Sequence, residues 1–490
     1  MTKLLLTLLI AVQGTGLPSG ALESNGAPDL VIKASRVLVG NGDVLEDAII
    51  HVRDGKIVAV GKGIAIPADA RILDLEGSTV MPGMVESLAS AGLPGGSAEN
   101  EEGREHTASL RISQAIDAHH ASLTRKRNEG VTSLAVHPGG RNVTGGVVCW
   151  VKPRGAAGAD LVARDDIALR ISLGRDPAAG HGGGRGRGGS ALLKRRPNSR
   201  MSTLFEVRQQ LQRAVTYGRR RERDPEIPPN PDYDLTLRAL AGKIPVYWLA
   251  RSENDIRAAL RIAAEFGITR NVILEGHQAD RCAAELSAAK VPVFVGPLFH
   301  PQYRGGGRRP SAADEPVIDP LQHAHLHDHD HEPVKEVCLL GCDKDHEHVT
   351  CGNPDHVHDE TWLTCLGHDC CAMGGYAPPT DVHYPAFTAL HLWKTGVDCA
   401  FARGGDRDGE RLLDFARFAV RHGLPAPRAI QMVTLDPARI LGIDDRVGSI
   451  AVGKDADLVV FNGDPLAPTS AVTLVVIDGE IVRDQKEKTR

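Results

Sequence analysis

The sequence predicts an α/β protein in which a (β/α)8 barrel carries a small composite β-sandwich formed by the N- and C-terminal segments. Two observations lead to this prediction. Short strand-like runs separated by turns occupy residues 30–80 and return in residues 448–482, and strand-like runs alternate with helical runs between them. Strands from opposite ends of a chain can share one sheet when the intervening domain brings its ends together, as a closed barrel does.

The predicted sandwich consists of residues 28–81 and 446–485. In the first segment, the strand-like runs 48–52 and 56–60 flank the pair Asp54-Gly55, which is typical of a tight hairpin turn. Similar alternating runs fill the second segment. If the two segments formed separate sheets, each would leave unpaired strand edges. We therefore expect them to form one sandwich beside the barrel.

The predicted barrel spans residues 82–445. Three buried strand-like runs alternate there with two helical runs, in the order 244–249, 255–266, 271–274, 279–290 and 291–295. Such a series requires parallel strands with right-handed crossovers. A later strand and helix of the same kind are expected at 397–402 and 410–421.

The N-terminus has the layout of a secretory signal peptide, which we place at residues 1–22. Lys3 precedes the apolar run 4–12, and small residues follow it. Because a bilayer span needs ~20 apolar residues, this run predicts export to the periplasm or the exterior without stable membrane insertion. The net charge of −5 also disfavours a nucleic-acid partner for the whole chain.

Two segments interrupt the barrel pattern. The first, 182–224, is rich in Arg and Gly, and we interpret it as a solvated loop, with nucleic-acid binding as the weaker alternative. Within it, Leu204, Val207, Leu211 and Val215 have helical spacing, so a helix is expected to return the chain to the barrel. The second segment, 301–379, is rich in His and Cys and too long for an ordinary barrel loop.

The second insertion has the composition of a transition-metal site, since thiolates and imidazoles at short spacing suit such ions, Zn above all. Six of the nine Cys lie in it. The candidate ligands are Cys338, Cys342, His346, His348, Cys351, His356, His358, Cys365, His368, Cys370 and Cys371. Three interpretations stay open: a structural Zn clip, a disulfide-bonded loop, and a metal-sequestering or metal-sensing surface.

Three motifs resemble the amidohydrolase superfamily, and in particular its imidazolonepropionase-like subgroup. They are Val-Met-Pro-Gly-Met-Val-Glu at 80–86, the segment 130–139, and the closing segments 434–442 and 448–460 with Gly-Lys-Asp-Ala-Asp. The resemblance implies a TIM-like barrel with a sandwich. It also implies a hydrolase that acts on carbon–nitrogen bonds other than peptide bonds in a small-molecule substrate.

Members of that superfamily bind a divalent metal through His-x-His on the first barrel strand, later His residues and a final Asp. Here Leu88 and Ser90 stand at the paired positions, Leu249 at the next, and Asp406 is displaced by about two residues from the last. The resemblance therefore implies a degenerate site in which a barrel metal is doubtful.

Three residues are the candidate catalytic groups: His277 after a predicted strand, Asp406, and Lys152 as a carbamylated bridging ligand. Ordinary structural roles are the alternative for His277, for Lys152 and for a further mouth candidate, Glu275, and His137 is interpreted as a surface or packing residue.

The leading hypothesis is a hydrolase of this superfamily with possible reduction or loss of activity. The alternative is a non-catalytic exported metal-binding protein that uses the barrel as scaffold and the His/Cys-rich insertion as its site. A homo-oligomer is compatible with either.

Overall fold

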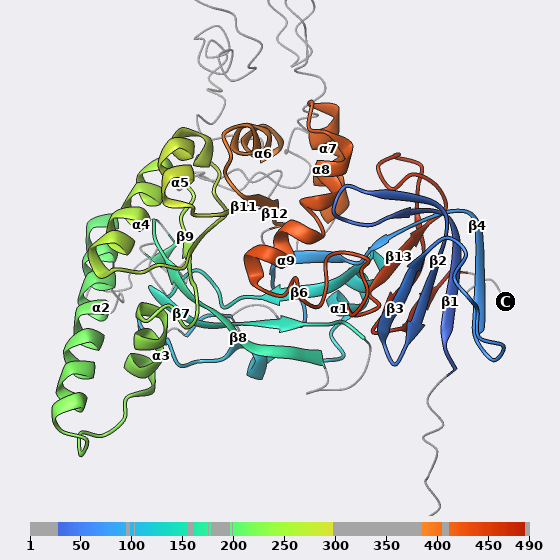
Figure 1. Cartoon of the computed structure of the whole chain (residues 1–490). Helices are drawn as coiled ribbons and strands as arrows, with labels where there is room; N and C mark the ends of the chain where they lie inside the picture. Colours follow the sequence, from blue (N-terminus) through green and yellow to red (C-terminus); the bar gives the residue numbers. More distant parts are fainter. Residues whose placement is uncertain are drawn as a thin grey trace, which may run out of the picture.

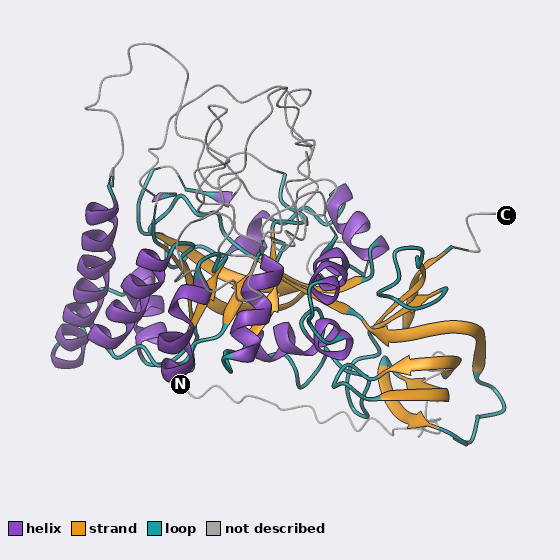
Figure 2. Cartoon of the chain, turned by 90° about the horizontal axis from the view of Figure 1, so that it is seen from above, coloured by secondary structure: helices purple, strands orange, loops and turns teal. Residues whose placement is uncertain are grey.

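The strands form one sheet of seven and one of eight, and the helices pack around the eight-stranded sheet (Figures 1 and 2). The computed structural model describes residues 28–94, 99–101, 103–154, 161–174, 176–177, 197, 199–296, 385–403 and 411–485. The predicted signal peptide and the His/Cys-rich insertion lie outside these ranges. No helix within them is both long and apolar enough to cross a membrane.

The seven-stranded sheet combines both ends of the chain, as predicted (Figure 1). Its strands are β1 (Leu30–Leu38), β2 (Val44–Arg53), β3 (Lys56–Gly61), β4 (Arg71–Pro82), β13 (Leu458–Phe461), β14 (Val472–Ile477) and β15 (Glu480–Asp484). Their order is β15-β14-β13-β4-β1-β2-β3. The antiparallel pair β4 and β13, with Val80 opposite Val460, joins the two segments. The composite sandwich is therefore confirmed.

The predicted Asp-Gly hairpin joins β2 to β3. Asp54 and Gly55 both have positive φ, 50° and 74°, which is the backbone of a two-residue type I′ turn. A Cβ atom at Gly55 would lie 2.8 Å from the carbonyl oxygen of Asp478. Glycine is thus required both for the turn and for its close packing against the turn between β14 and β15.

The eight-stranded sheet forms the barrel. Its strands are β5 (Met84–Ala89), β6 (Val131–Val136), β7 (Thr144–Val151), β8 (Val162–Ser172), β9 (Val246–Leu249), β10 (Asn271–Leu274), β11 (Val293–Val295) and β12 (Cys399–Phe401). Neighbours in the sheet follow the order of the chain. The TIM-like barrel is confirmed, and the predicted strands at 244–249, 271–274 and 291–295 correspond to β9, β10 and β11.

One strand departs from the parallel arrangement that we expected. β7 runs antiparallel to both β6 and β8. The connection from β6 to β7 covers only residues 137–143, whereas a parallel crossover needs about a dozen residues or more. The chain must therefore turn back directly, and β8 then resumes the parallel direction against β9.

Hydrogen bonds from side chains bring the first and last strands of the barrel together. The Ser87 hydroxyl of β5 donates to the Phe401 carbonyl of β12 over 3.1 Å. The Glu86 carboxylate accepts from the Arg403 backbone N–H over 2.9 Å, and its other oxygen lies 3.2 Å from the buried Lys126 ammonium. These contacts link β5 to the chain beyond β12 and complete the ring.

Nine α-helices are found among the described residues, mostly as the crossovers between barrel strands. They are α1 (Ala121–Asn128), α2 (Arg200–Arg223), α3 (Pro231–Leu240), α4 (Glu253–Phe266), α5 (Ala283–Ala289), α6 (Pro385–Lys394), α7 (Leu412–Arg421), α8 (Ala426–Gln431) and α9 (Leu435–Leu441). The predicted helix at 255–266 is α4, which the Ser252 hydroxyl caps at its start and Gly267, with φ of 68°, ends.

The basic insertion is partly a barrel helix. Residues 200–223 of the predicted segment 182–224 form α2, and Val207, Leu211 and Ala214 on one face of it are buried. The helical spacing seen in the sequence therefore corresponds to a core-facing helix that packs beside α3 (Figure 1). Most of the Arg/Gly-rich part, residues 182–196, lies outside the described residues.

Candidate functional site

The carboxyl ends of the parallel strands meet at one face of a barrel, which is where barrel enzymes place their chemistry. At this face, the barrel mouth, His137 follows β6, Arg170 belongs to the end of β8, Arg251 follows β9, and Glu275 follows β10. All four are buried or nearly so. The mouth therefore contains a set of buried titratable groups.

The interior below the mouth is apolar. Leu88 and Leu249, the residues at two predicted ligand positions, are 4% and 1% exposed and pack in one cluster with Leu274 and Phe294. Hydrocarbon side chains offer no electron pair to a metal. The described residues also contain no group of three or more His, Cys, Asp or Glu that could hold a metal ion. The described part of the mouth does not fit a divalent metal.

A network of ion pairs lies across the strand ends. The Arg251 guanidinium bonds the Glu275 carboxylate and also lies 2.6 Å from the Asp176 carboxylate. Burial alone would raise the pKa of Glu275, but Arg251 outweighs it, and the pKa falls to about 2. Glu275 has a φ of 53°, a backbone conformation that non-glycine residues rarely adopt and that is often found at functional sites.

Arg170 anchors the loop that crosses the mouth. Its guanidinium donates to the Pro138 carbonyl, and burial lowers the pKa of Arg170. A Cβ atom at Gly140 would come within 2.8 Å of Leu249 and 3.3 Å of Arg170. The loop after β6 therefore lies directly against the strand ends, where glycine permits the close approach.

His137 is held as a neutral imidazole. Its Nε2 donates to the Ser87 carbonyl over 2.9 Å, which places the lone pair on Nδ1. Burial and the nearby Arg170 lower the pKa of His137 well below its usual value. Its Nδ1 has no hydrogen-bond partner among the described residues. The ring also stacks on Tyr247, with 5.9 Å between centroids. A buried, neutral nitrogen base thus stands at the mouth.

The structure separates the candidate catalytic residues of the sequence. His277 is buried just beyond β10, and its carbonyl accepts from the Thr388 hydroxyl over 3.3 Å. Asp406 lies outside the described residues, as do all the candidate metal ligands from Cys338 to Cys371. Lys152 lies at the opposite end of the barrel, because β7 is antiparallel and Val151 pairs with Val162, the first residue of β8.

Lys152 joins the barrel to the sandwich. Its buried ammonium lies 2.6 Å from the carboxylates of Asp455 and Asp478 and 3.2 Å from that of Asp457. Burial lowers the pKa of Lys152, but the three carboxylates outweigh it, and the pKa is raised. Carbamylation needs an unprotonated amine, so this environment opposes the bridging role that we considered. Lys152 and His277 do not share a site.

Two residues of the mouth, Arg251 and Arg170, were not predicted from the sequence. Arg251 directly follows the predicted strand 244–249, so its place at a strand end was a usable signal. Arg170 belongs to β8, a strand that the sequence analysis did not identify. His137 was interpreted as a surface or packing residue, and the structure shows it buried with a free nitrogen among the described residues.

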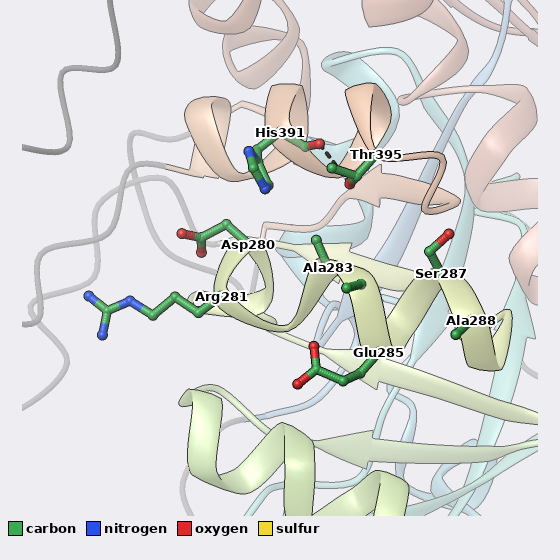
Figure 3. Close-up of a pocket in the computed structure, with 9 residues that line it drawn as sticks. Asp280, Arg281, Ala283, Glu285, Ser287, Ala288, His391 and Thr395 are labelled. Carbon is green, nitrogen blue, oxygen red and sulfur yellow. Dashed lines mark hydrogen bonds between the residues drawn. The ribbon is translucent and has the colours of Figure 1, made fainter. Parts of the chain in front are cut away.

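A shallow groove of about 640 Å³ lies on the outer face of the barrel, between α5 and α6 (Figure 3). Asp280, Ala283 and Ser287 line one side, and His391 and Thr395 line the other. The Thr395 hydroxyl donates to the His391 carbonyl of its own helix over 2.9 Å. The groove lies between helices outside the sheet, and it contains no arrangement of groups that suits catalysis.

Comparison with known proteins agrees with the resemblance of the sequence. A model of the amidohydrolase family matches residues 394–482. Amidohydrolase tasK of Hapsidospora irregularis is 25% identical over 470 residues, covering 89% of this chain but 39% of that protein. This chain therefore spans about two fifths of the length of that relative.

Two further likenesses concern a short segment of the chain and the whole of the fold. N-acetylglucosamine-6-phosphate deacetylase of Haemophilus influenzae is 44% identical over 57 residues, which are 12% of this chain and 14% of that protein. The crystal structure of an amidohydrolase from Thermotoga maritima MSB8 has a TM-score of 0.70 and 25% identity, covering 93% of this chain and 100% of that chain.

Proposed function

We propose that this chain is a hydrolase with reduced or lost activity, whose bond class is carbon–nitrogen bonds other than peptide bonds. The proposal starts from the chain's membership of the amidohydrolase superfamily. The barrel mouth is the proposed substrate site. The relatives named as an amidohydrolase and a deacetylase support this bond class. The finer subgroup, imidazolonepropionase-like, rests on the motifs of the sequence alone.

The observation that carries reduced activity is the apolar filling of the barrel. Leu88 and Leu249 occupy positions where the superfamily places metal-binding imidazoles, and both are buried among other apolar side chains. A bound divalent metal would supply an activated water and polarise the scissile carbonyl. The described residues do not hold such a metal, so we assign no step to it.

Any remaining hydrolysis needs a base for the attacking water. Glu275 is a weak base, because its pKa is about 2. His137 is the other candidate, since its Nδ1 keeps a lone pair without a partner among the described residues, and its lowered pKa makes it a weak base as well, in keeping with reduced activity. In this proposal His137 accepts a proton from water, and Arg170 and the Arg251–Glu275 pair hold the loop and strand ends around it.

Restoring the two lost imidazoles tests this proposal. The full-length wild-type chain should hydrolyse small cyclic and linear amides near the background rate. The variant L88H/L249H should bind Zn in the barrel at least ~10-fold more tightly, because a catalytic Zn site needs about three protein ligands. The measurements are amide hydrolysis by chromatography and the change in Zn affinity and Zn content relative to wild type.

The matched control is L88N/L249N, which introduces polar groups of similar position without imidazoles and should not raise Zn affinity to the same extent. Wild-type turnover of about 1 s⁻¹ or faster on an amide would contradict reduced activity, since that is an ordinary enzymatic rate. If a metal chelator abolished that turnover, a catalytic metal would be present, and Leu88 and Leu249 would not mark a lost metal site.

A second function, metal binding by the His/Cys-rich insertion, is favoured by the sequence of residues 323–371. We expect divalent transition metal, Zn first, to copurify with the exported chain and to fall by at least half when Cys338, Cys342 and Cys351 become Ser. The melting temperature of the barrel should change little, because none of those residues belongs to the described strands and helices that form the barrel. Unchanged metal content in the triple variant would reject this site.

A further inference from the structure

A second cleft, the rim cleft, lies on the outer side of the barrel and has a volume of about 400 Å³. That volume falls within the range of roughly 300–1,000 Å³ typical of small-molecule sites. The cleft is lined by residues of α2, of α3 with its N-terminal cap, and of the segment between β5 and α1. They are Arg104, Glu105, His106, Glu206, Gln210, Asn230, Asp232 and Tyr233.

The rim cleft is level with the barrel mouth but outside its interior. His106 forms a parallel bridge to Thr144, and Thr144 lies opposite Ile171, which is near the carboxyl end of β8. The His106 Nδ1 is also 3.1 Å from the Thr144 hydroxyl. The cleft is thus fixed to the barrel wall through His106, and its lining shares no residue with the mouth.

Two carboxylates of the rim cleft keep acceptor capacity. The Asp232 Oδ1 accepts from the Ser109 backbone N–H at 2.8 Å and from the Ser109 hydroxyl at 2.7 Å, which orients the carboxylate. The Asp232 Oδ2 is 3.7 Å from the Arg104 guanidinium, beyond hydrogen-bond distance. Glu206 forms one long hydrogen bond of 3.5 Å with the His106 Nε2, through Oε2, and its Oε1 has no hydrogen-bond partner among the described residues. Both carboxylates therefore remain available to hydroxyl donors.

The donors of the rim cleft are side-chain amides. Gln210 is 4% exposed, and its Nε2 has no hydrogen-bond partner among the described residues. A buried unpaired amide costs free energy, and because Gln210 lines the cleft, this donor is available to a ligand group that accepts from it. The Asn230 Oδ1 accepts from the Tyr233 backbone N–H at 3.1 Å, so the Nδ2 is the donor that Asn230 contributes to the lining.

We propose that the rim cleft binds a polyhydroxylated small molecule of the size of a monosaccharide. Hydroxyl groups both donate and accept, which matches carboxylates and amides placed side by side. The Tyr233 ring also belongs to the lining, and its packing on Tyr217, with 5.3 Å between centroids, holds it in place. The site goes beyond the proposed hydrolase function, because it is separate from the barrel mouth.

Other ligand classes fit the rim cleft less well. The carboxylates of Glu105, Glu206 and Asp232 repel an anion. Two guanidinium groups offset much of the attraction that these carboxylates have for a cation. Arg104 lies 3.7 Å from Asp232, and Arg213 lies close enough to His106 to lower its pKa. Burial also lowers the pKa of His106, so that residue adds no full positive charge at neutral pH. A neutral ligand with many hydroxyls remains the best match.

The test is calorimetric titration of the full chain with glucose and N-acetylglucosamine, with putrescine and succinate as cationic and anionic comparators. We expect saturable binding of a sugar and not of the comparators. Gln210→Leu should weaken sugar binding about tenfold or more, because it removes a buried donor. The melting temperature of the free chain should stay the same or rise, since leucine removes an unpaired buried amide and favours helix.

The matched control is Gln212→Leu, because Gln212 is exposed on the same helix and does not line the rim cleft. It should leave sugar binding unchanged. Glu206→Gln provides a second variant that should weaken binding while keeping the shape of the cleft. Binding of putrescine or succinate but no sugar, no binding at all, or sugar binding that both cleft variants leave intact would each overturn the proposal.

Discussion

Replacing Lys152 with Met should lower the free energy of unfolding by about 3–5 kcal/mol, because it removes the buried cation that three aspartates share and leaves Asp457 without an ion-pair partner among the described residues. The Lys152 ammonium is fully buried and bonds Asp455 and Asp478 at 2.6 Å each. Those residues belong to the sandwich end of the chain, whereas Lys152 follows β7 of the barrel. Urea unfolding at pH 7, followed by circular dichroism, measures the change.

Lys56→Met is the matched control for this prediction. Lys56 bonds the same Asp455 carboxylate, but its side chain is 45% exposed, and exposed ion pairs contribute about 1 kcal/mol or less. The Lys152 variant should also lose its single cooperative transition, since it removes a link between barrel and sandwich. An equal effect of both substitutions would show that burial of the network does not matter to stability.

The composite sandwich could be predicted because its signals are local. Asp54-Gly55 determines the backbone of one hairpin, and short apolar runs between turn residues, as in β1 and β14, mark the strands. The pairing of β4 with β13 joins residues about 380 positions apart. It followed from the topological argument that a closed barrel returns its ends to one place.

The strands β7 and β8 could not be predicted in the same way. β7 is buried on both faces, so its sequence lacks the alternation that marks a half-buried strand. Its antiparallel direction reversed the expected location of Lys152, which moved from the mouth to the amino end of the barrel. The three aspartates that surround Lys152 are more than 300 residues away in the chain, and no local pattern indicates them.

The sequence predicted those features of the candidate site that depend only on the chemistry of a single residue type. Leu88 and Leu249 cannot bind a metal, whatever their surroundings, and the structure shows them packed together inside the barrel. The role of His137 depends instead on tertiary contacts. Its tautomer is set by the Ser87 carbonyl, which only folding brings within 2.9 Å of its Nε2.

Replacing Arg251 with Met should destabilise the chain by about 3–5 kcal/mol at pH 7, because Glu275 then stays buried without its cation. In the wild type, Arg251 bonds Glu275 and lies 2.6 Å from Asp176, and the pKa of Glu275 is about 2 against an ordinary value of 4.5. The depressed pKa contributes stability above pH 4.5, and this contribution is lost as the pH falls toward 2. By linkage, that amounts to about 3 kcal/mol.

The sign of the pH dependence should reverse in the Arg251 variant. Without the guanidinium, burial is the largest remaining influence on Glu275, so we expect its pKa to rise above the ordinary value, with Arg170 and His277 limiting the rise. A carboxyl with a raised folded-state pKa stabilises below its unfolded pKa, and that stability is lost as the pH rises through the folded value. The difference in unfolding free energy between wild type and variant should therefore shrink from pH 7 to pH 4. Adding Glu275→Gln should recover part of the loss and flatten the response, whereas a difference that is equal at both pH values would show that the Arg251–Glu275 pair does not determine it.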